Sequence, residues 1–289
     1  MKKLPIGIDD FKKLIEKNAY YIDKTKYIEK ILDDISEVKL FIRPRRFGKT
    51  LNMLTLKYFF DIENKEENKK LFKNLYIEKS EYFKEQGQYP VIFISLKGLK
   101  EKTWENCFNE IKALISKLYN EFEFIKKVLN ESELNIFDKI WLKKDDGEYT
   151  NALKNLTSFL YKYYKKEVIL LIDEYDAPLI NAYEYGYYDE AILFFKVFYG
   201  EALKTNLYLR TGIMTGIIRV IKAGIFSDLN NLKVYSILDK EYSDFFGFTQ
   251  EEVKKSLEDF KIEYELPDVK SWYDGYKFGN SEVYNPWSI

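Results

Sequence analysis

The 289-residue sequence contains no histidine and a single cysteine, Cys107. The absence of histidine excludes Ser-His-Asp and Cys-His catalytic triads, histidine-ligated zinc and histidine general bases. One cysteine excludes an internal disulfide bond and a multi-cysteine metal site. Any chemistry must therefore come from carboxylates, lysine, arginine, hydroxyl groups and backbone amides.

Long hydrophobic runs are also missing. The longest apolar runs have the length of a strand, as in 168–172, whereas a membrane-spanning helix needs about 20 apolar residues. The N-terminal segment MKKLPIGIDDF lacks the apolar core of a signal peptide. We therefore expect a cytoplasmic protein that makes no membrane contact.

Neither sign of charge predominates. Lys and Arg together number 46, Asp and Glu number 47, and the net charge is -1. This balance excludes a globally basic nucleic-acid-binding surface, although a local basic patch stays open. Hydrophobic residues make up 46% of the chain, so it can bury a sizeable core.

Arginine is scarce and unevenly placed. Three of the five arginines lie within residues 43–46, and Arg210 and Arg219 are the others. The planar fork of donors in arginine suits phosphate or carboxylate better than lysine does. Codon drift in an AT-rich genome is the alternative explanation of this clustering.

Apolar periodicity predicts buried strands alternating with helices. Strands are expected over 37–42, 89–96, 167–172 and 207–214, with 232–237 as a fifth candidate. Continuous apolar strands that alternate with helices are typical of a parallel sheet covered on both faces. The sequence therefore predicts an α/β fold with a mostly parallel central sheet.

The C-terminal region starts with a helix signal. Thr249 is a candidate N-cap and Glu252 stands at the capping-box position. We expect residues 1–245 to form the core and residues 246–289 to form a small lid or connector. The ending YNPWSI favours truncation before a further C-terminal domain.

The strongest chemical signal is Phe47-Gly48-Lys49-Thr50, between a predicted strand and a predicted helix. This is the context of a Walker A phosphate loop, in which backbone amides and the helix dipole attract phosphate. Lys49 would reach the β- and γ-phosphates, and the Thr50 hydroxyl would bind magnesium. The usual pattern, G-x-x-x-x-G-K-[ST], starts with glycine where this chain has Arg43. A GKT run in an ordinary turn is the alternative.

The second signal is the carboxylate pair Asp173-Glu174 directly after the apolar run 168–172. This is the Walker B arrangement, at the strand end where ligands bind in open α/β sheets. Asp173 would hold magnesium through water, and Glu174 would orient and activate the attacking water. A surface turn after a buried strand is the alternative.

A third signal follows the strand 207–214. Thr215 is positioned to sense the γ-phosphate, and Arg219 is a candidate for stabilising transition-state charge in its own site or a neighbour's. An action in a neighbour's site would require a homo-oligomer. An ordinary strand-end turn with a solvated Arg219 is equally open.

The combination LFIRPRRFGKTLNMLTLKYFFD, LLIDEYDAPL, TGIIRVIKAGIFSDLNNLKVYSI and WYDGYKFG…VYNPWSI closely resembles the bacterial AAA-ATPase-like family over essentially the whole chain. In that family RPRRFGKT is the phosphate loop, and arginine in place of its first glycine is the usual form. The resemblance implies a P-loop NTPase three-layer sandwich that binds ATP and Mg²⁺ and hydrolyses ATP. Members usually continue into a restriction-endonuclease-like nuclease domain, which implies that domain, and DNA through it, as partners.

The predicted site has three groups of residues. The catalytic candidates are Glu174, Lys49, Thr215 and Arg219. The nucleotide-binding candidates are Arg45, Arg46, Phe47, Gly48, Lys49, Thr50 and Leu51, and the metal-binding candidates are Thr50 and Asp173.

Two other functions remain open. One is a nucleotide-responsive module that binds nucleic acid or protein with little or no hydrolysis. The Asp173-Glu174 pair favours hydrolysis, because a pure binder has no need of Glu174. The other is DNA binding through the RPRR run, against which the neutral charge balance argues. The segment 21–25 also has two open interpretations. It borders the adenine base, or it is the start of a helix capped by Asp23.

Overall fold

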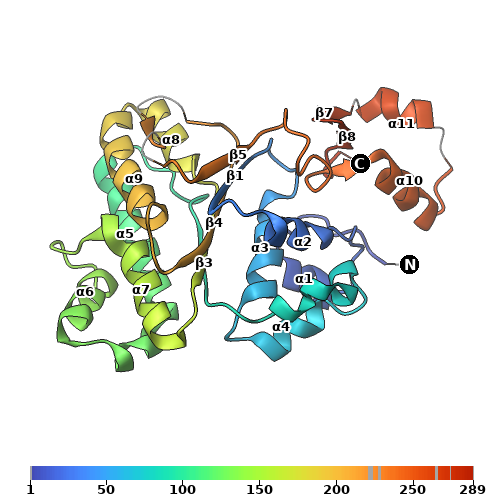
Figure 1. Cartoon of the computed structure of the whole chain (residues 1–289). Helices are drawn as coiled ribbons and strands as arrows, with labels where there is room; N and C mark the ends of the chain where they lie inside the picture. The colour runs from blue at the N-terminus through green and yellow to red at the C-terminus, as the bar shows by residue number, and fades with distance from the viewer. Residues whose placement is uncertain (1, 221–223, 227–228, 264–265, 274, 289) are drawn as a thin grey trace. The chain divides into compact units, whose positions relative to one another are not determined.

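The computed structural model describes residues 2–220, 224–226, 229–263, 266–273 and 275–288 (Figure 1). The chain divides into two compact units. The first comprises Met1–Ile35, Phe41–Gln88 and Val234–Ile289, and the second comprises Ser36–Leu40 and Tyr89–Lys233. None of the helices in the described ranges is long and apolar enough to cross a membrane.

The central element is a five-stranded, all-parallel sheet flanked by helices, with the order β2-β3-β4-β1-β5. Its strands are β1 (Val38–Ile42), β2 (Val91–Ser95), β3 (Val168–Asp173), β4 (Leu209–Gly216) and β5 (Leu232–Tyr235). Every residue of β3 is buried, as expected for an apolar strand between two parallel neighbours. The predicted α/β fold class is therefore confirmed.

Strand register brings particular residues side by side at the carboxyl ends. Ser95 of β2 pairs with Asp173 of β3, and Ile172 of β3 pairs with Met214 of β4. The next residue of β4, Thr215, therefore belongs to the strand itself, whereas the sequence predicted that the strand stops at 214.

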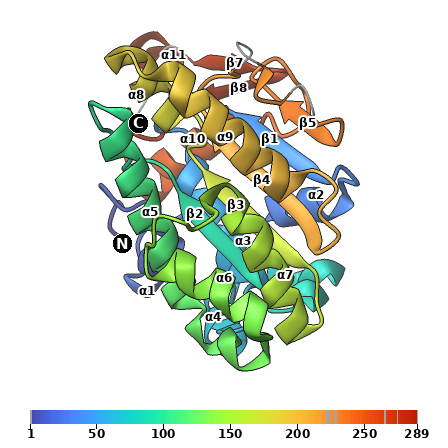
Figure 2. The same cartoon turned by 90° about the vertical axis from the view of Figure 1, so that its left-hand side faces the viewer.

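Helices of the second unit cover one face of β2, β3 and β4. Figure 2 shows α5, α7 and α9 lying across these strands. The helices of this unit are α5 (Trp104–Glu121), α6 (Glu131–Trp141), α7 (Ala152–Tyr164), α8 (Ala177–Tyr185) and α9 (Tyr188–Leu203), with 3₁₀ turns at Glu123–Val128 and Tyr149–Asn151. The sequence patterns did not predict α8, which follows directly on the carboxylate-bearing turn.

The first unit combines short helices with a small antiparallel sheet of order β6-β8-β7. Its elements are α1 (Phe11–Glu16), α2 (Lys26–Asp33), α3 (Lys49–Phe60), α4 (Lys65–Leu71), 3₁₀ turns at Tyr76–Lys79 and Glu81–Glu85, β6 (Phe248–Thr249), α10 (Gln250–Asp259), α11 (Leu266–Tyr273), β7 (Tyr276–Phe278) and β8 (Ser281–Tyr284). Buried aromatic side chains fill its core, among them Phe11, Tyr27, Phe41 and Phe59.

Two helix-start predictions had different outcomes. The capping box at α10 is confirmed, because the Thr249 hydroxyl accepts from the Glu252 amide while the Glu252 carboxylate accepts from the Thr249 amide. The prediction that Asp23 caps α2 is wrong, since the N-cap is Thr25. Asp23 instead accepts from the amide and hydroxyl of Thr25, two residues on, at 2.8 and 2.7 Å. The boundary predicted at residue 245 stays a prediction.

Candidate functional site

The predicted phosphate loop lies between the end of β1 and the start of α3. Gly48 is the N-cap of α3, with φ of 80°, a left-handed conformation that glycine adopts without strain. A Cβ built on Gly48 would meet nothing within 4 Å. The backbone therefore favours glycine here, and the space beside it is open.

Lys49 is the first residue of α3, and its side chain folds back over the loop. The residue is buried, and its Nζ donates to the carbonyl oxygens of Arg43 at 3.0 Å and Pro44 at 2.8 Å. Thr50 and Leu51 follow half-buried in the first helical turn. The ammonium group thus sits against the backbone of the loop that the sequence predicts to cradle phosphate.

The other loop side chains point in different directions. Arg45 and Arg46 are exposed, and the guanidinium of Arg46 lies 4.8 Å from the ring centroid of Trp287. Phe47 is buried and packs against the ring of Phe278, with the two centroids 5.2 Å apart. A nucleotide contact by Phe47 would therefore have to use its backbone.

Arg43, at the position of the missing glycine, is fully buried. Its NH1 donates to the carbonyl oxygens of Ile42 and Tyr235, both at 2.9 Å, and its NH2 donates to that of Tyr242 at 3.1 Å. The guanidinium also lies 4.9 Å from the ring centroid of Phe246. Burial lowers the pKa of Arg43 to about 10, so the side chain stays charged at neutral pH. The sequence flagged this position as a departure and gave no role to its side chain.

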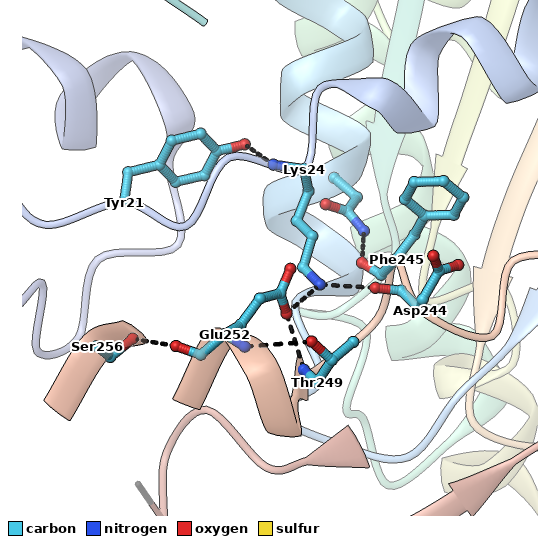
Figure 3. Close-up of polar contacts among 8 residues, drawn as sticks. Tyr21, Lys24, Asp244, Phe245, Thr249, Glu252 and Ser256 are labelled. Carbon is cyan, nitrogen blue, oxygen red and sulfur yellow. Dashed lines mark hydrogen bonds and ion pairs between the residues drawn. The ribbon is translucent and has the colours of Figure 1, made fainter. Parts of the chain in front are cut away.

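Figure 3 shows a second polar cluster in the same unit. Lys24 Nζ donates to Glu252 Oε2 and to the carbonyl oxygen of Asp244, both at 2.6 Å. Beside it, Asn52 of α3 donates to the carbonyl oxygen of Phe245 at 3.0 Å. Burial lowers the pKa of Lys24, and the nearby carboxylate of Glu252 opposes that shift. Two adjacent carbonyl groups are thus fixed by donors from distant parts of the chain.

The second unit carries the carboxylate site. Asp173 is fully buried at the end of β3. Its Oδ1 accepts from the Thr215 hydroxyl at 2.6 Å, and its Oδ2 accepts from the Ser95 hydroxyl at 3.4 Å. The structure therefore brings Asp173 and Thr215 together, as their positions at neighbouring strand ends predict, and adds Ser95 to them.

Glu174 turns the chain out of β3. It is half-buried and has φ of 54°, a left-handed conformation that costs a residue other than glycine about 1–2 kcal/mol. Its amide donates to the Thr215 hydroxyl at 3.3 Å. Such strain persists where surrounding contacts hold a residue in place, and the role predicted for this carboxylate stays a prediction.

The residues after Glu174 fix the segment that follows β4. Asp176 Oδ2 accepts from the amides of Ile217 at 2.7 Å and Ile218 at 2.8 Å. The Tyr175 hydroxyl donates to the carbonyl oxygen of Ile218 at 2.8 Å. Arg219 is exposed on this segment. The sequence analysis missed both anchoring roles, and the acidic residue shortly after the Asp-Glu pair was a visible signal only for that of Asp176.

Comparison with known proteins supports the predicted resemblance. Residues 5–226 match the family model described as "Predicted AAA-ATPase". A protein of Azotobacter chroococcum mcd 1, named "Uncharacterized protein in vnfD 5'region", is 27% identical over 295 residues that cover all of this chain. The chain spans 51% of that relative's length. No solved structure matches the chain. Because the family model covers most of the sequence, the chain belongs to the AAA-ATPase-like family.

Proposed function

We propose that this chain is a magnesium-dependent ATPase module. The observation that carries the proposal is the phosphate loop, in which left-handed Gly48 opens α3 and the Lys49 ammonium lies against the loop backbone. Loops of this kind bind phosphate with backbone amides, the helix N-terminus and the lysine. Membership of a family of predicted AAA-ATPases supports ATP as the nucleotide.

The donor groups of the carboxylate site suit Mg²⁺, which prefers oxygen ligands and commonly uses one or two carboxylates together with substrate phosphates. The side-chain atoms through which Asp173, Thr215 and Ser95 contact one another are all oxygens. No group of three or more Cys, Asp or Glu within the described ranges is arranged to hold a metal ion, and a single aspartate meets the need. We assign Asp173 and Thr50 to Mg²⁺, which when bound would neutralise charge on the phosphates.

The remaining predicted residues receive roles that their chemistry allows. Glu174 orients a water molecule and accepts its proton during attack on the γ-phosphate. Thr215 senses the γ-phosphate at the strand end, and Arg219 neutralises charge that develops in the transition state. Arg45 and Arg46 contribute positive potential beside the phosphate loop.

The nucleotide cycle has a further proposed purpose. The chain spans 51% of its relative's length, which leaves room in such proteins for another domain. We propose that ATP binding and hydrolysis gate a nuclease-like domain in the longer protein, and DNA access through it.

A calorimetric titration of the chain with MgATP tests the proposal. Lys49→Ala is expected to weaken ATP binding by about 100-fold or more, because it removes a charged phosphate contact. Lys57→Ala, in the last turn of the same helix, is the matched control and is expected to bind ATP like the parent. Equal ATP affinity of Lys49→Ala and the parent would remove the phosphate loop from the site.

A further inference from the structure

Arg43 links the phosphate loop to a segment far along the chain. Its guanidinium donates to the carbonyl oxygens of Tyr235 and Tyr242, which are 192 and 199 residues away in sequence. The planar guanidinium has several donors in a fixed fork, so it can hold more than one acceptor at once. A glycine at this position, as in the usual phosphate-loop pattern, would make none of these contacts.

The backbone of Arg43 has a second connection, to Lys49. The carbonyl oxygen of Arg43 accepts from Lys49 Nζ at 3.0 Å. Arg43 therefore has two roles: its side chain binds the C-terminal segment, and its backbone carbonyl group binds the ammonium of the phosphate-binding lysine. Any shift of Arg43 would move an acceptor away from that ammonium group.

Other contacts also join the loop and helix α3 to the C-terminal part of the chain. The Gly247 amide donates to the carbonyl oxygen of Phe47 at 3.1 Å, and Asn52 donates to that of Phe245. Phe278 packs on Phe47 and lies 5.4 Å from the guanidinium of Arg43. The loop and the segment 235–247 thus stabilise each other's conformation.

The C-terminal segment is also anchored from the N-terminal side. Lys24 holds the carbonyl group of Asp244 and the capping-box carboxylate Glu252 of α10 (Figure 3). The ammonium is largely buried, with a side chain 10% exposed, so the contact is screened little by solvent. Docking of α10 and the position of segment 235–247 are therefore coupled.

We propose that Arg43 is a positioning residue that makes nucleotide binding by Lys49 depend on the docked C-terminal segment 235–247. In this proposal, which rests on the ATP-binding function above, the hydrogen bonds of the arginine fix the loop backbone, which a glycine at this position would leave free to move. Displacement of the segment releases the loop and lowers the affinity for ATP. A partner or domain that moves this segment would thereby control nucleotide occupancy.

The decisive variant is Arg43→Gly, which restores the usual G-x-x-x-x-G-K-T pattern. If the pattern alone determined binding, this variant would bind MgATP at least as tightly as the parent. The positioning role predicts the opposite. The affinity for MgATP should be weaker by about tenfold or more, because three hydrogen bonds to backbone carbonyl groups are lost.

Two readouts separate this role from a general loss of stability. Guanidinium chloride at low millimolar concentration is expected to restore part of the ATP affinity of Arg43→Gly, whereas sodium chloride is not. Arg43→Lys, which keeps the charge and loses the fork, is expected to bind ATP with intermediate affinity. Arg43→Lys also decides the question if Arg43→Gly does not fold. Binding of ATP by Arg43→Lys with the affinity of the parent would overturn the positioning role of Arg43.

Amide hydrogen exchange of the nucleotide-free protein tests the coupling without ATP. Arg43→Gly is expected to accelerate exchange in residues 43–52 and 235–247 together. Unchanged exchange in 235–247, or tighter ATP binding by Arg43→Gly, overturns the proposal. Failure of the parent to bind ATP would overturn the proposed function, while the exchange rates would still decide whether Arg43 couples the two segments.

Discussion

The phosphate loop and the carboxylate-bearing strand end are held in place in different ways. Arg43 in the loop binds carbonyl groups 192 and 199 residues away in sequence. At the strand end, Asp173 and Asp176 bind groups 42 and 41 residues away, from the neighbouring strand β4 and its continuation. The loop therefore depends on the docking of a distant segment, whereas the strand end depends on the pairing of adjacent strands.

This difference predicts different sensitivities. Closing a long stretch of chain costs conformational entropy before its contacts form, so the loop is expected to loosen first when the protein is perturbed. The strand end is part of a buried parallel ladder, and such elements usually open only with global unfolding. Nucleotide affinity should accordingly be easier to modulate than the geometry around Asp173.

The largest expected effect on stability is at Asp176. Asp176→Ala removes the acceptor of two backbone amides and is expected to lower the free energy of unfolding by about 3 kcal/mol. Asp176→Asn keeps an acceptor oxygen and should recover most of that loss. Urea unfolding of the three proteins measures the difference. A loss in Asp176→Ala no greater than in Asp176→Asn would show that the anchor does not depend on an acceptor at this position.

A smaller effect is expected where the loop meets the C-terminal segment. Gly247 has φ of 85°, and a Cβ there would lie 2.8 Å from a ring carbon of Phe47 and 2.9 Å from the carbonyl oxygen of Tyr284. Gly247→Ala is expected to cost about 2 kcal/mol, because steric overlap adds to the left-handed backbone strain.

Gly186 is the matched control for that substitution. It has φ of 83° at the end of α8, and its Cβ would meet nothing within 4 Å. Gly186→Ala is expected to cost about 1 kcal/mol, from backbone strain alone. Thermal unfolding compares the two variants, and MgATP titration should show weakened binding only in Gly247→Ala. Equal losses of stability in both variants would mean that the close approach of Gly247 to Phe47 contributes nothing.

The sequence predicted the parts of the fold that local patterns determine. Apolar runs located the five strands of the parallel sheet, and the Thr249–Glu252 capping box was correct in detail. The short strands β6, β7 and β8 were not predicted. Asp23 was misassigned because its side chain makes a local turn with Thr25, one of several ways in which aspartate satisfies nearby amides. Helix α8 was missed since it is short and starts directly after the carboxylate turn.

The candidate site residues come from sequence motifs, and their roles stay predictions, whereas the contacts that support them could not be predicted. The meeting of Asp173 with Thr215 follows from adjacent parallel strands, which a sequence pattern can indicate. The contacts of Arg43 with Tyr235 and Tyr242 join segments that are 192 and 199 residues apart in sequence, and no periodicity indicates such a pairing. A buried arginine in place of glycine was visible as an anomaly, but only packing explains it.

The proposed function places nucleotide binding at the phosphate loop and activation of water at Glu174. The most direct test measures MgATP binding and phosphate release on the same sample of Glu174→Gln, beside the parent. We predict ATP affinity within about threefold of the parent and loss of phosphate release. Phosphate release at the parent's rate by Glu174→Gln would contradict the proposed role of Glu174 in activating water.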